Sequence, residues 1–260
     1  MQTQPKISII TPSLNQGRFI EETILSVLSQ GYENLEYIIV DGLSTDETLS
    51  ILEKYSDKLR WISEKDTGQT NAINKGLAMA KGEIVGYLNA DDILLPNALL
   101  NVADMFVKQP QVMWVIGQCN ITDENGNEVR SFITLYKNLM LRFRSFPLLC
   151  ITNFISQPAT LWRRSIVDSL GFLDENLNYV MDYEFWLRIY AKYRPLFMES
   201  YLASFRVHPN SKTSAVGHKE EYIAEERAII QRHTNSKTLL FFHKIHRSIM
   251  TFIYSQINHQ

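Results

Sequence analysis

Cysteine is nearly absent from this chain, which has only Cys119 and Cys150 among its 260 residues. The two form neither a Cys-x-x-Cys pair nor a zinc-finger spacing, so a reducing environment fits better than a disulfide or metal-finger framework. No apolar run approaches the roughly 20 residues that a transmembrane helix needs. The start of the chain, MQTQPK, also lacks the apolar stretch of a secretory signal peptide. We therefore expect a cytoplasmic protein.

Glycine-rich phosphate-binding motifs are missing as well. No Gly-x-Gly-x-x-Gly follows the first predicted strand, which argues against a dehydrogenase, and no Gly-Lys-Ser/Thr of a P-loop occurs. A strong net charge is also absent, because 26 Lys and Arg against 28 Asp and Glu leave only −2, so we expect no nucleic-acid partner. Any diphosphate bound here must be neutralised by another group, and a metal ion is one candidate.

The first hundred residues instead show a regular alternation of strand and helix patterns. Short apolar strands are predicted at residues 7–10, 37–40, 59–62 and 84–88. Helices are predicted between them, one of them opened by a capping box at Ser44–Glu47, and Pro96 starts a further helix. Near-continuous apolar strands that alternate with helices predict an α/β fold with a mainly parallel central sheet covered on both faces.

The second half of the chain is less regular. It predicts a strand at 112–116, a turn at Asn125-Gly126, a helix at 184–193 and two helices after Gly217. No linker separates two independent domains. We expect one domain over residues 1–215, with a nucleotide-binding half at 1–100 and an acceptor half at 101–215, followed by a helical extension at 216–260.

Polar residues follow three of the predicted strands, namely Thr11-Pro12-Ser13, Asp41 and Asn89-Ala90-Asp91-Asp92. Chain direction brings the carboxyl ends of parallel strands to one edge, where open α/β sheets bind ligands. Each segment taken alone is also typical of a turn. Adjacent carboxylates repel each other unless a cation compensates, and carboxylates completed by phosphate oxygens suit Mg²⁺ or Mn²⁺. Together the three segments predict a polar crevice with a divalent cation.

Four segments resemble glycosyltransferase family 2, whose members have the GT-A fold. They are ISIITPSLNQGRFIEETILSVLSQGYENLEYIIVDGLSTDET from Ile7, SEKDTGQTNAINKGLAMAKGEIVGYLNADDILLP from Ser63, VMDYEFWLR from Val180 and FRVHPNS from Phe205. Their order and spacing make the resemblance specific over roughly residues 5 to 210. The resemblance implies an inverting transfer of a sugar from a nucleoside-diphosphate sugar to an acceptor hydroxyl, as in the assembly of cell-surface polysaccharides or glycolipids.

The resemblance also assigns residues to the nucleotide and to the metal. The family's acidic Asp-x-Asp motif falls on Asn89-Ala90-Asp91, so Asn89 replaces an acid, and Ile73 stands where many members have an Arg. Metal ligands are expected among Asp91, Asp92 and His208. Asp92 can equally be a turn residue, and a lone His is more often structural. The nucleotide contacts implied are Thr11, Pro12, Ser13, Asn15, Asp41, Asp66, Lys75 and Asn89.

Asp182 falls where the family has its catalytic base, although Met181 replaces the acidic residue that often precedes it. A base within hydrogen-bond reach of the acceptor hydroxyl is what the transfer requires. Asp182 can also be a helix cap, and both roles are compatible. Gln157, Trp186 and Arg206 are expected near the acceptor or the donor sugar, although aromatic residues such as Trp186 more often belong to the core.

The end of the chain has apolar residues at helical spacing from Leu239 to Ile257, with Lys244 and Arg247 on the other side. This pattern favours a helix that packs on the domain or on a second subunit, and the alternative is a helix that lies on the inner face of a membrane. We expect the acceptor to be a saccharide or a lipid-linked molecule, and the donor sugar to carry uridine, guanosine or thymidine.

Two other functions compete with a metal-dependent glycosyltransferase. A nucleotidyltransferase on a similar fold needs a glycine-rich, basic loop after the first strand, and Thr11–Asn15 is not such a loop. A carbohydrate-binding protein without turnover does not require Asp91, Asp182 and His208 together. The transferase therefore remains the favoured prediction.

Overall fold

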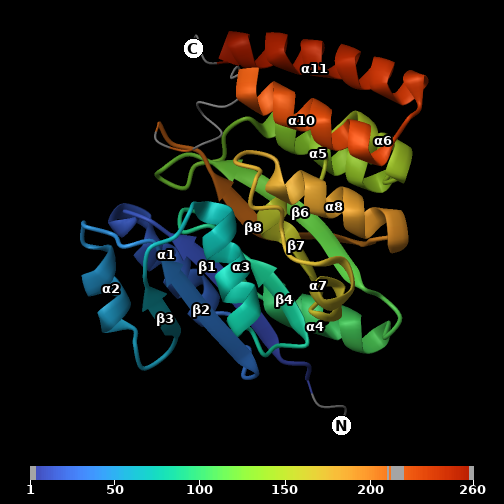
Figure 1. Ribbon diagram of the computed structural model, residues 1–260. Helices are drawn as coiled ribbons and strands as arrows, with labels where there is room; N and C mark the ends of the chain where they lie inside the picture. The colour runs from blue at the N-terminus through green and yellow to red at the C-terminus, as the bar shows by residue number, and fades with distance from the viewer. Residues whose placement is uncertain (1–3, 210, 212–219, 258–260) are drawn as a thin grey trace.

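The computed structural model describes residues 4–209, 211 and 220–257 of the protein. One eight-stranded sheet, in the order β3-β2-β1-β4-β7-β6-β8-β5, runs through it with helices on both faces (Figure 1). Alternate strand residues enter two separate cores: Ile10 and Ile38 pack on one face of the sheet, and Ile9 and Ile39 pack on the other. This period of two confirms the predicted α/β architecture.

The first half of the sheet is parallel, as its alternating pattern predicts. Helix α3 packs on β1 so closely that a Cβ on Gly76 would lie 2.3 Å from Cγ2 of Ile10. Only glycine fits there, and it lets the second half of α3 lie directly on the middle of β1. The elements are β1 (Ile7–Ser13), α1 (Gly17–Leu28), β2 (Leu35–Asp41), α2 (Thr48–Lys54), β3 (Arg60–Ser63), α3 (Gln69–Met79) and β4 (Ile84–Tyr87).

The second half of the sheet is mixed. β7 is antiparallel to both β4 and β6, β5 is antiparallel to β8, and β6 and β8 are parallel. The elements are β5 (Ile93–Leu94), α4 (Ala98–Lys108), β6 (Trp114–Thr122), α5 (Ser131–Arg142), α6 (Phe146–Ile151), η1 (Gln157–Ala159), β7 (Thr160–Arg163), α7 (Ser165–Leu170), α8 (Met181–Lys192) and β8 (Leu196–Arg206).

Two local predictions differ from the structure. Helix α2 begins at Thr48, and its N-cap residue, Glu47, makes no side-chain cap hydrogen bond. The Ser44 hydroxyl donates to Asp41, whereas Asp46 accepts from the amides of Thr48 and Gly17. Asp182 lies inside the first turn of α8 and is not its cap, since Val180 occupies that position. The turn predicted at Asn125-Gly126 does form, with Gly126 at a φ of 84°.

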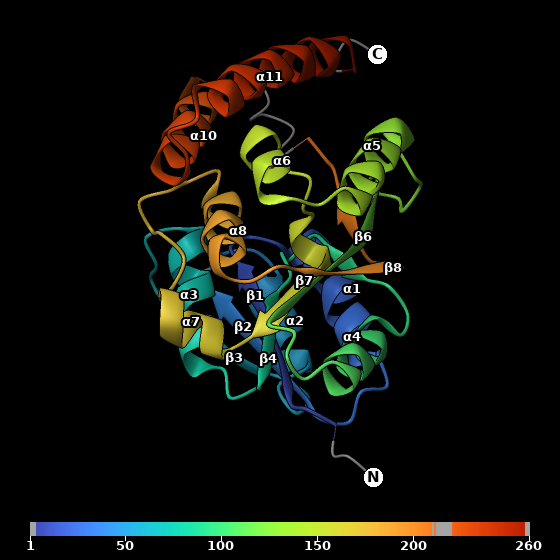
Figure 2. The same ribbon diagram turned by 90° about the vertical axis from the view of Figure 1, so that its right-hand side faces the viewer.

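Two helices, α10 (Glu220–His233) and α11 (Lys237–Ile257), complete the described chain. They lie at the same end of the molecule as α5 and α6, opposite the amino terminus, in both views (Figures 1 and 2). The predicted boundary after residue 215 lies outside the described residues and stays a prediction. No described helix has the length and apolarity that crossing a membrane requires.

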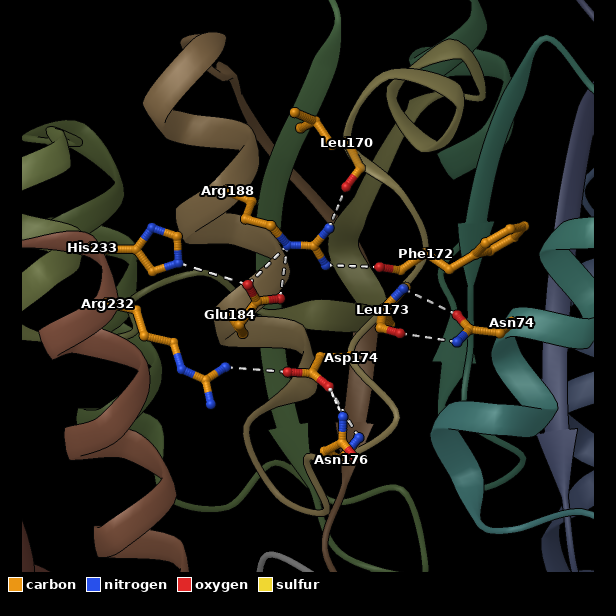
Figure 3. A network of polar contacts seen from close by, with 10 residues as sticks. All are labelled: Asn74, Leu170, Phe172, Leu173, Asp174, Asn176, Glu184, Arg188, Arg232 and His233. Carbon is orange, nitrogen blue, oxygen red and sulfur yellow. Dashed lines mark hydrogen bonds and ion pairs between the residues drawn. The ribbon is translucent and has the colours of Figure 1, made fainter.

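A polar network attaches α10 to the body of the protein (Figure 3). Arg188 of α8 donates two hydrogen bonds to Glu184, at 2.8 and 2.9 Å, and two more to the carbonyls of Leu170 and Phe172. His233 of α10 lies 3.7 Å from the same carboxylate. Burial alone would raise the pKa of Glu184, but His233 and Arg188 lower it below its usual range. The network thus holds α8, and with it Asp182, in place.

Arg188→Gln is expected to destabilise the protein by about 2–4 kcal/mol, because it leaves the Glu184 carboxylate, only 8% exposed, without its main partner. Urea unfolding followed by circular dichroism measures the change. The matched control is Arg194→Gln, an exposed arginine just beyond α8, which we expect to cost less than about 0.5 kcal/mol. Equal losses in the two variants would show that the network does not stabilise the fold.

Candidate functional site

A cavity of about 710 Å³ opens where β1 and β4 end. Strand ends form its floor, and helices from the second half of the chain form its walls. Lining residues come from the loop after β1, the start of α3, the turn after β4, and helices α5, α8, α10 and α11. The cavity therefore lies at the sheet edge that the polar strand ends predict, and the C-terminal helices contribute to it.

The turn after β4 separates its two adjacent carboxylates. Asp92 is fully buried and accepts hydrogen bonds from the amide of Arg206 at 3.0 Å and from Asn89 Nδ2 at 3.1 Å. Burial, and then the neighbouring charge of Asp91, raise the pKa of Asp92 well above its usual range. Asp91 instead lines the cavity. The hydroxyl of Thr23 stabilises the turn by donating to the carbonyls of Ala90 and Asp92.

His208 lies beside Asp91. Its Nε2 is 3.1 Å from Asp91 Oδ2, and its ring packs on Phe19 with a centroid distance of 4.6 Å. The side chains of His208 and Asp91 both line the cavity, so an imidazole nitrogen and a carboxylate lie next to each other at its surface. Of the segment expected to carry this histidine, Asn210 lies outside the described residues.

A divalent cation fits Asp91 and His208 but not the full set of ligands that the sequence predicts. Asp92 is a correction: its oxygens point into the protein, where Arg206 and Asn89 occupy them. Within residues 4–209, 211 and 220–257, no group of three or more His, Cys, Asp or Glu could hold a metal by itself. One oxygen and one nitrogen donor leave several positions to phosphate oxygens and water, as Mg²⁺ and Mn²⁺ prefer.

Four of the expected nucleotide contacts line the cavity: Pro12, Ser13, Asp66 and Asn89. The hydroxyl of Ser13 is buried and makes no hydrogen bond to any described residue, which leaves it available to a ligand. Asn89 Oδ1 accepts from Gln69 Nε2 at 2.8 Å. The Asp66 carboxylate accepts from the amide of Gly68 and borders Gly42.

The other four nucleotide candidates do not line the cavity. The Thr11 hydroxyl is 3.0 Å from the Tyr37 hydroxyl inside the sheet, and Asn15 Oδ1 accepts from the amide of Thr45. Asp41 is fully buried and accepts from Ser44 and Ser63, so it organises the loops around it. Lys75 is a correction, because its ammonium binds Glu64 and the carbonyl of Lys65.

Asp182 enters the cavity from the first turn of α8. Burial raises its pKa above the ordinary value of 3.8, although the amide of Tyr183 and the charge of Lys137 act in the opposite direction. Lys137 lines the same cavity from α5, and burial lowers the pKa of its ammonium. A carboxylate and an ammonium thus face one enclosed space.

The three residues expected near the sugars separate into two groups. Gln157 lines the cavity, where its Oε1 is 3.3 Å from Asn89 Nδ2. Trp186 is a correction: it is fully buried and stacks on Trp114 with centroids 5.8 Å apart. Arg206 is also a correction, since it is 2% exposed, pairs with Glu22 and lies over the ring of Phe19.

Sequence reasoning missed Lys137 and Gln69. Gln69 lies in a segment that carries the family resemblance, so its position was a usable signal. Lys137 has no such signal. It is the one charged residue in the apolar segment SFITLYKNLML, and the neighbouring sequence does not predict that it lines the cavity. Tyr222 of α10 and Arg247 of α11 also line the cavity and were not expected there.

Solved structures with a similar fold include a mannosyltransferase and a protein that binds a nucleotide sugar. The mannosyltransferase PcManGT of Pyrobaculum calidifontis, in complex with GDP-Man and Mn²⁺, is 18% identical with a TM-score of 0.72, over 98% of this chain and 74% of that one. Residues 1–349 of S. aureus TarS, in complex with UDP-GlcNAc, are 19% identical with a TM-score of 0.67, over 96% of this chain and 71% of that one. The architecture is the GT-A fold.

Sequence comparisons extend the likeness to the family. An uncharacterized glycosyltransferase of Rickettsia prowazekii is 30% identical over 224 residues, which are 84% of this chain and 69% of that protein. The model of glycosyl transferase family 2 matches residues 8–171. This match covers more than half of the chain, and we conclude that the protein is a glycosyltransferase of family 2.

Proposed function

We propose that the protein is an inverting, metal-dependent glycosyltransferase that uses a nucleoside-diphosphate sugar and has Asp182 as its base. The observation that carries the proposal is the convergence of Asp91, His208 and Asp182 on one cavity from β4, β8 and α8. A binding protein without turnover needs no carboxylate with a raised pKa opposite a metal-binding pair. Such a group in a cleft is typical of a catalytic site.

The donor nucleotide occupies the part of the cavity formed by Pro12, Ser13, Asp66 and Asn89. Support comes from the unpaired Ser13 hydroxyl and from the solved relatives, whose complexes hold GDP-Man and UDP-GlcNAc. The diphosphate then lies at Asp91 and His208. A divalent cation bound there supplies stabilisation of the negative charge on the departing diphosphate.

The acceptor approaches from the side of α5 and α8. Asp182 accepts a hydrogen bond from the acceptor hydroxyl and takes its proton as the oxygen attacks the anomeric carbon. The nucleoside diphosphate leaves from the opposite face, so the configuration at that carbon inverts. The buried environment that raises the pKa of Asp182 makes it a stronger base than an exposed aspartate. The product joins a cell-surface polysaccharide or a glycolipid.

Asp91→Asn is expected to weaken the metal-dependent binding of the donor by about tenfold or more, because it removes a charged oxygen ligand. Thermal shift with UDP- and GDP-sugars, in Mn²⁺, Mg²⁺ or EDTA, measures the change. Wild-type protein shows a shift with metal and none with EDTA, and His208→Ala resembles Asp91→Asn. The matched control is Asp104→Asn on the exposed side of α4, which leaves the shift intact. A donor shift of equal size in EDTA contradicts the metal site.

Asp182→Asn is expected to reduce kcat by about 100- to 10,000-fold while donor binding persists, because an amide cannot take the proton. Nucleotide release measures turnover, and thermal shift measures donor binding. The control is Asp168→Asn on the surface of α7, which keeps both properties. Transfer by Asp182→Asn at close to the wild-type rate would remove Asp182 from the mechanism.

Lys137→Gln is expected to shift the acidic limb of kcat/KM to higher pH. The base must be ionised to act, so the rate falls below the pKa of Asp182, which burial has already raised. Loss of the Lys137 charge removes a favourable interaction with the carboxylate and raises that pKa further. The pH profile of nucleotide release, compared with that of the exposed control Lys108→Gln, tests this. A limb that stays in place or moves to lower pH refutes the coupling.

A further inference from the structure

Helices α5 and α11 have large apolar side chains exposed on their outer faces. On α5 the spacing of these residues is three or four along the helix, so they share one face. They are Phe132, Leu135, Leu139 and Phe143, of which Leu135 is 71% exposed.

The outer face of α11 carries a second row of such side chains, also at helical spacing. They are Phe241, Phe242, Ile245, Ile249 and Phe252, the last of them 66% exposed. Together we call these two rows the apolar rim. Both helices lie at the end of the molecule opposite the amino terminus (Figures 1 and 2). Exposed apolar groups concentrated on two helices mark an interaction surface, whereas isolated ones do not.

The charge of the two helices is of one sign. Residues 131–151 contain Lys137, Arg142 and Arg144, and residues 237–257 contain Lys237, Lys244 and Arg247, with no Asp or Glu in either segment. Of these six cations, Arg142, Lys237 and Lys244 are exposed. Exposed cations beside exposed aromatic and aliphatic groups complement an anionic lipid surface. A second copy of the chain would place like charges against one another, which disfavours a dimer through this surface.

The same two helices line the cavity with their inner faces. Thr134 and Lys137 of α5 and Arg247 and Met250 of α11 border it. Tyr136 and His246 join the helices, with the tyrosine hydroxyl 2.8 Å from Nε2 and the rings stacked at a centroid distance of 6.0 Å. A surface that contacts the apolar rim therefore lies next to the wall of the catalytic cavity.

We propose that the protein docks on an anionic membrane surface through the apolar rim, and that it takes its acceptor from that membrane as a lipid-linked hydroxyl. The second part rests on the proposed function. The lipid anchor stays in the bilayer, and the polar head enters between α5 and α11 toward Asp182. Helix α11 then lies along the interface and does not cross it, in keeping with its cationic residues.

The test of docking is sedimentation with vesicles of phosphatidylcholine alone and of phosphatidylcholine mixed with phosphatidylglycerol. Wild-type protein is expected to bind the anionic vesicles. The double variant Leu135→Gln/Phe252→Gln is expected to lower binding by about tenfold, because two exposed apolar side chains no longer enter the lipid. The matched control, Phe172→Gln, alters an aromatic residue of similar character, 45% exposed, on the loop after α7, and keeps binding.

The charge contribution is tested by Lys237→Gln and Lys244→Gln, both at exposed positions of α11. Each is expected to weaken binding to the anionic vesicles by about fivefold, with little change on phosphatidylcholine alone. Added salt reduces wild-type binding to anionic vesicles for the same reason. Binding that ignores both substitution and salt would overturn the electrostatic part of the proposal.

Two results would overturn the docking proposal. One is wild-type protein that stays unbound with anionic vesicles. The other is a dimer in light scattering that Leu135→Gln/Phe252→Gln converts to a monomer, since the apolar rim would then bind a second chain.

Nucleotide release in the presence of a water-soluble acceptor is measured in parallel, to separate docking from catalysis. The surface variants are expected to keep it while they lose transfer to an acceptor embedded in vesicles. Vesicle binding without any nucleotide release by the wild type would refute the proposed function and leave docking intact.

Discussion

The hydrogen bond from the amide of Arg206 to the buried carboxylate of Asp92 is the contact on which the site depends. It joins the turn after β4 to the end of β8, two segments more than a hundred residues apart in the chain. It holds the start of the segment that carries His208 beside the turn that carries Asp91. Burial and the neighbouring charge of Asp91 raise the pKa of Asp92 although this hydrogen bond acts in the opposite direction, and Asp91 is the carboxylate that lines the cavity.

The sequence allowed the edge of the sheet to be predicted, because chain direction alone brings the ends of parallel strands together. The direction in which each side chain at that edge points was not predictable. Thr11 and Ser13 lie on the same strand, yet the hydroxyl of Thr11 is paired with Tyr37 inside the sheet and that of Ser13 is unpaired at the cavity. Lys75 illustrates the same limit: it turns toward Glu64 because that carboxylate lies nearby, which only the fold reveals.

The second half of the chain was harder to predict for a topological reason. β7 lies between β4 and β6 and is antiparallel to both. Helices α5 and α6 connect β6 to β7, and no local sequence pattern predicts where this connection lies relative to the sheet. Lys137 reaches the cavity only through this arrangement. The role of Trp186 was ambiguous, since an aromatic residue beside the expected catalytic motif can either stack on a sugar ring or pack in the hydrophobic core. Its stacking on Trp114 places it in the core, where it supports the helix that carries Asp182.

The distribution of charge along the cavity explains why its two ends suit different partners. Under the proposed function the donor diphosphate lies beside Asp91 and His208, and a divalent cation between them would offset the repulsion between the diphosphate and the carboxylate. Lys137 of α5 and Arg247 of α11 line another part of the cavity, where Arg247 lies 3.4 Å from the carboxylate of Glu226. Under the proposed function, a group that enters between these helices passes Lys137 and the Glu226–Arg247 pair on its way to Asp182. If the proposed function holds, Lys137 would lie near any anionic group that the acceptor carries beside its reacting hydroxyl.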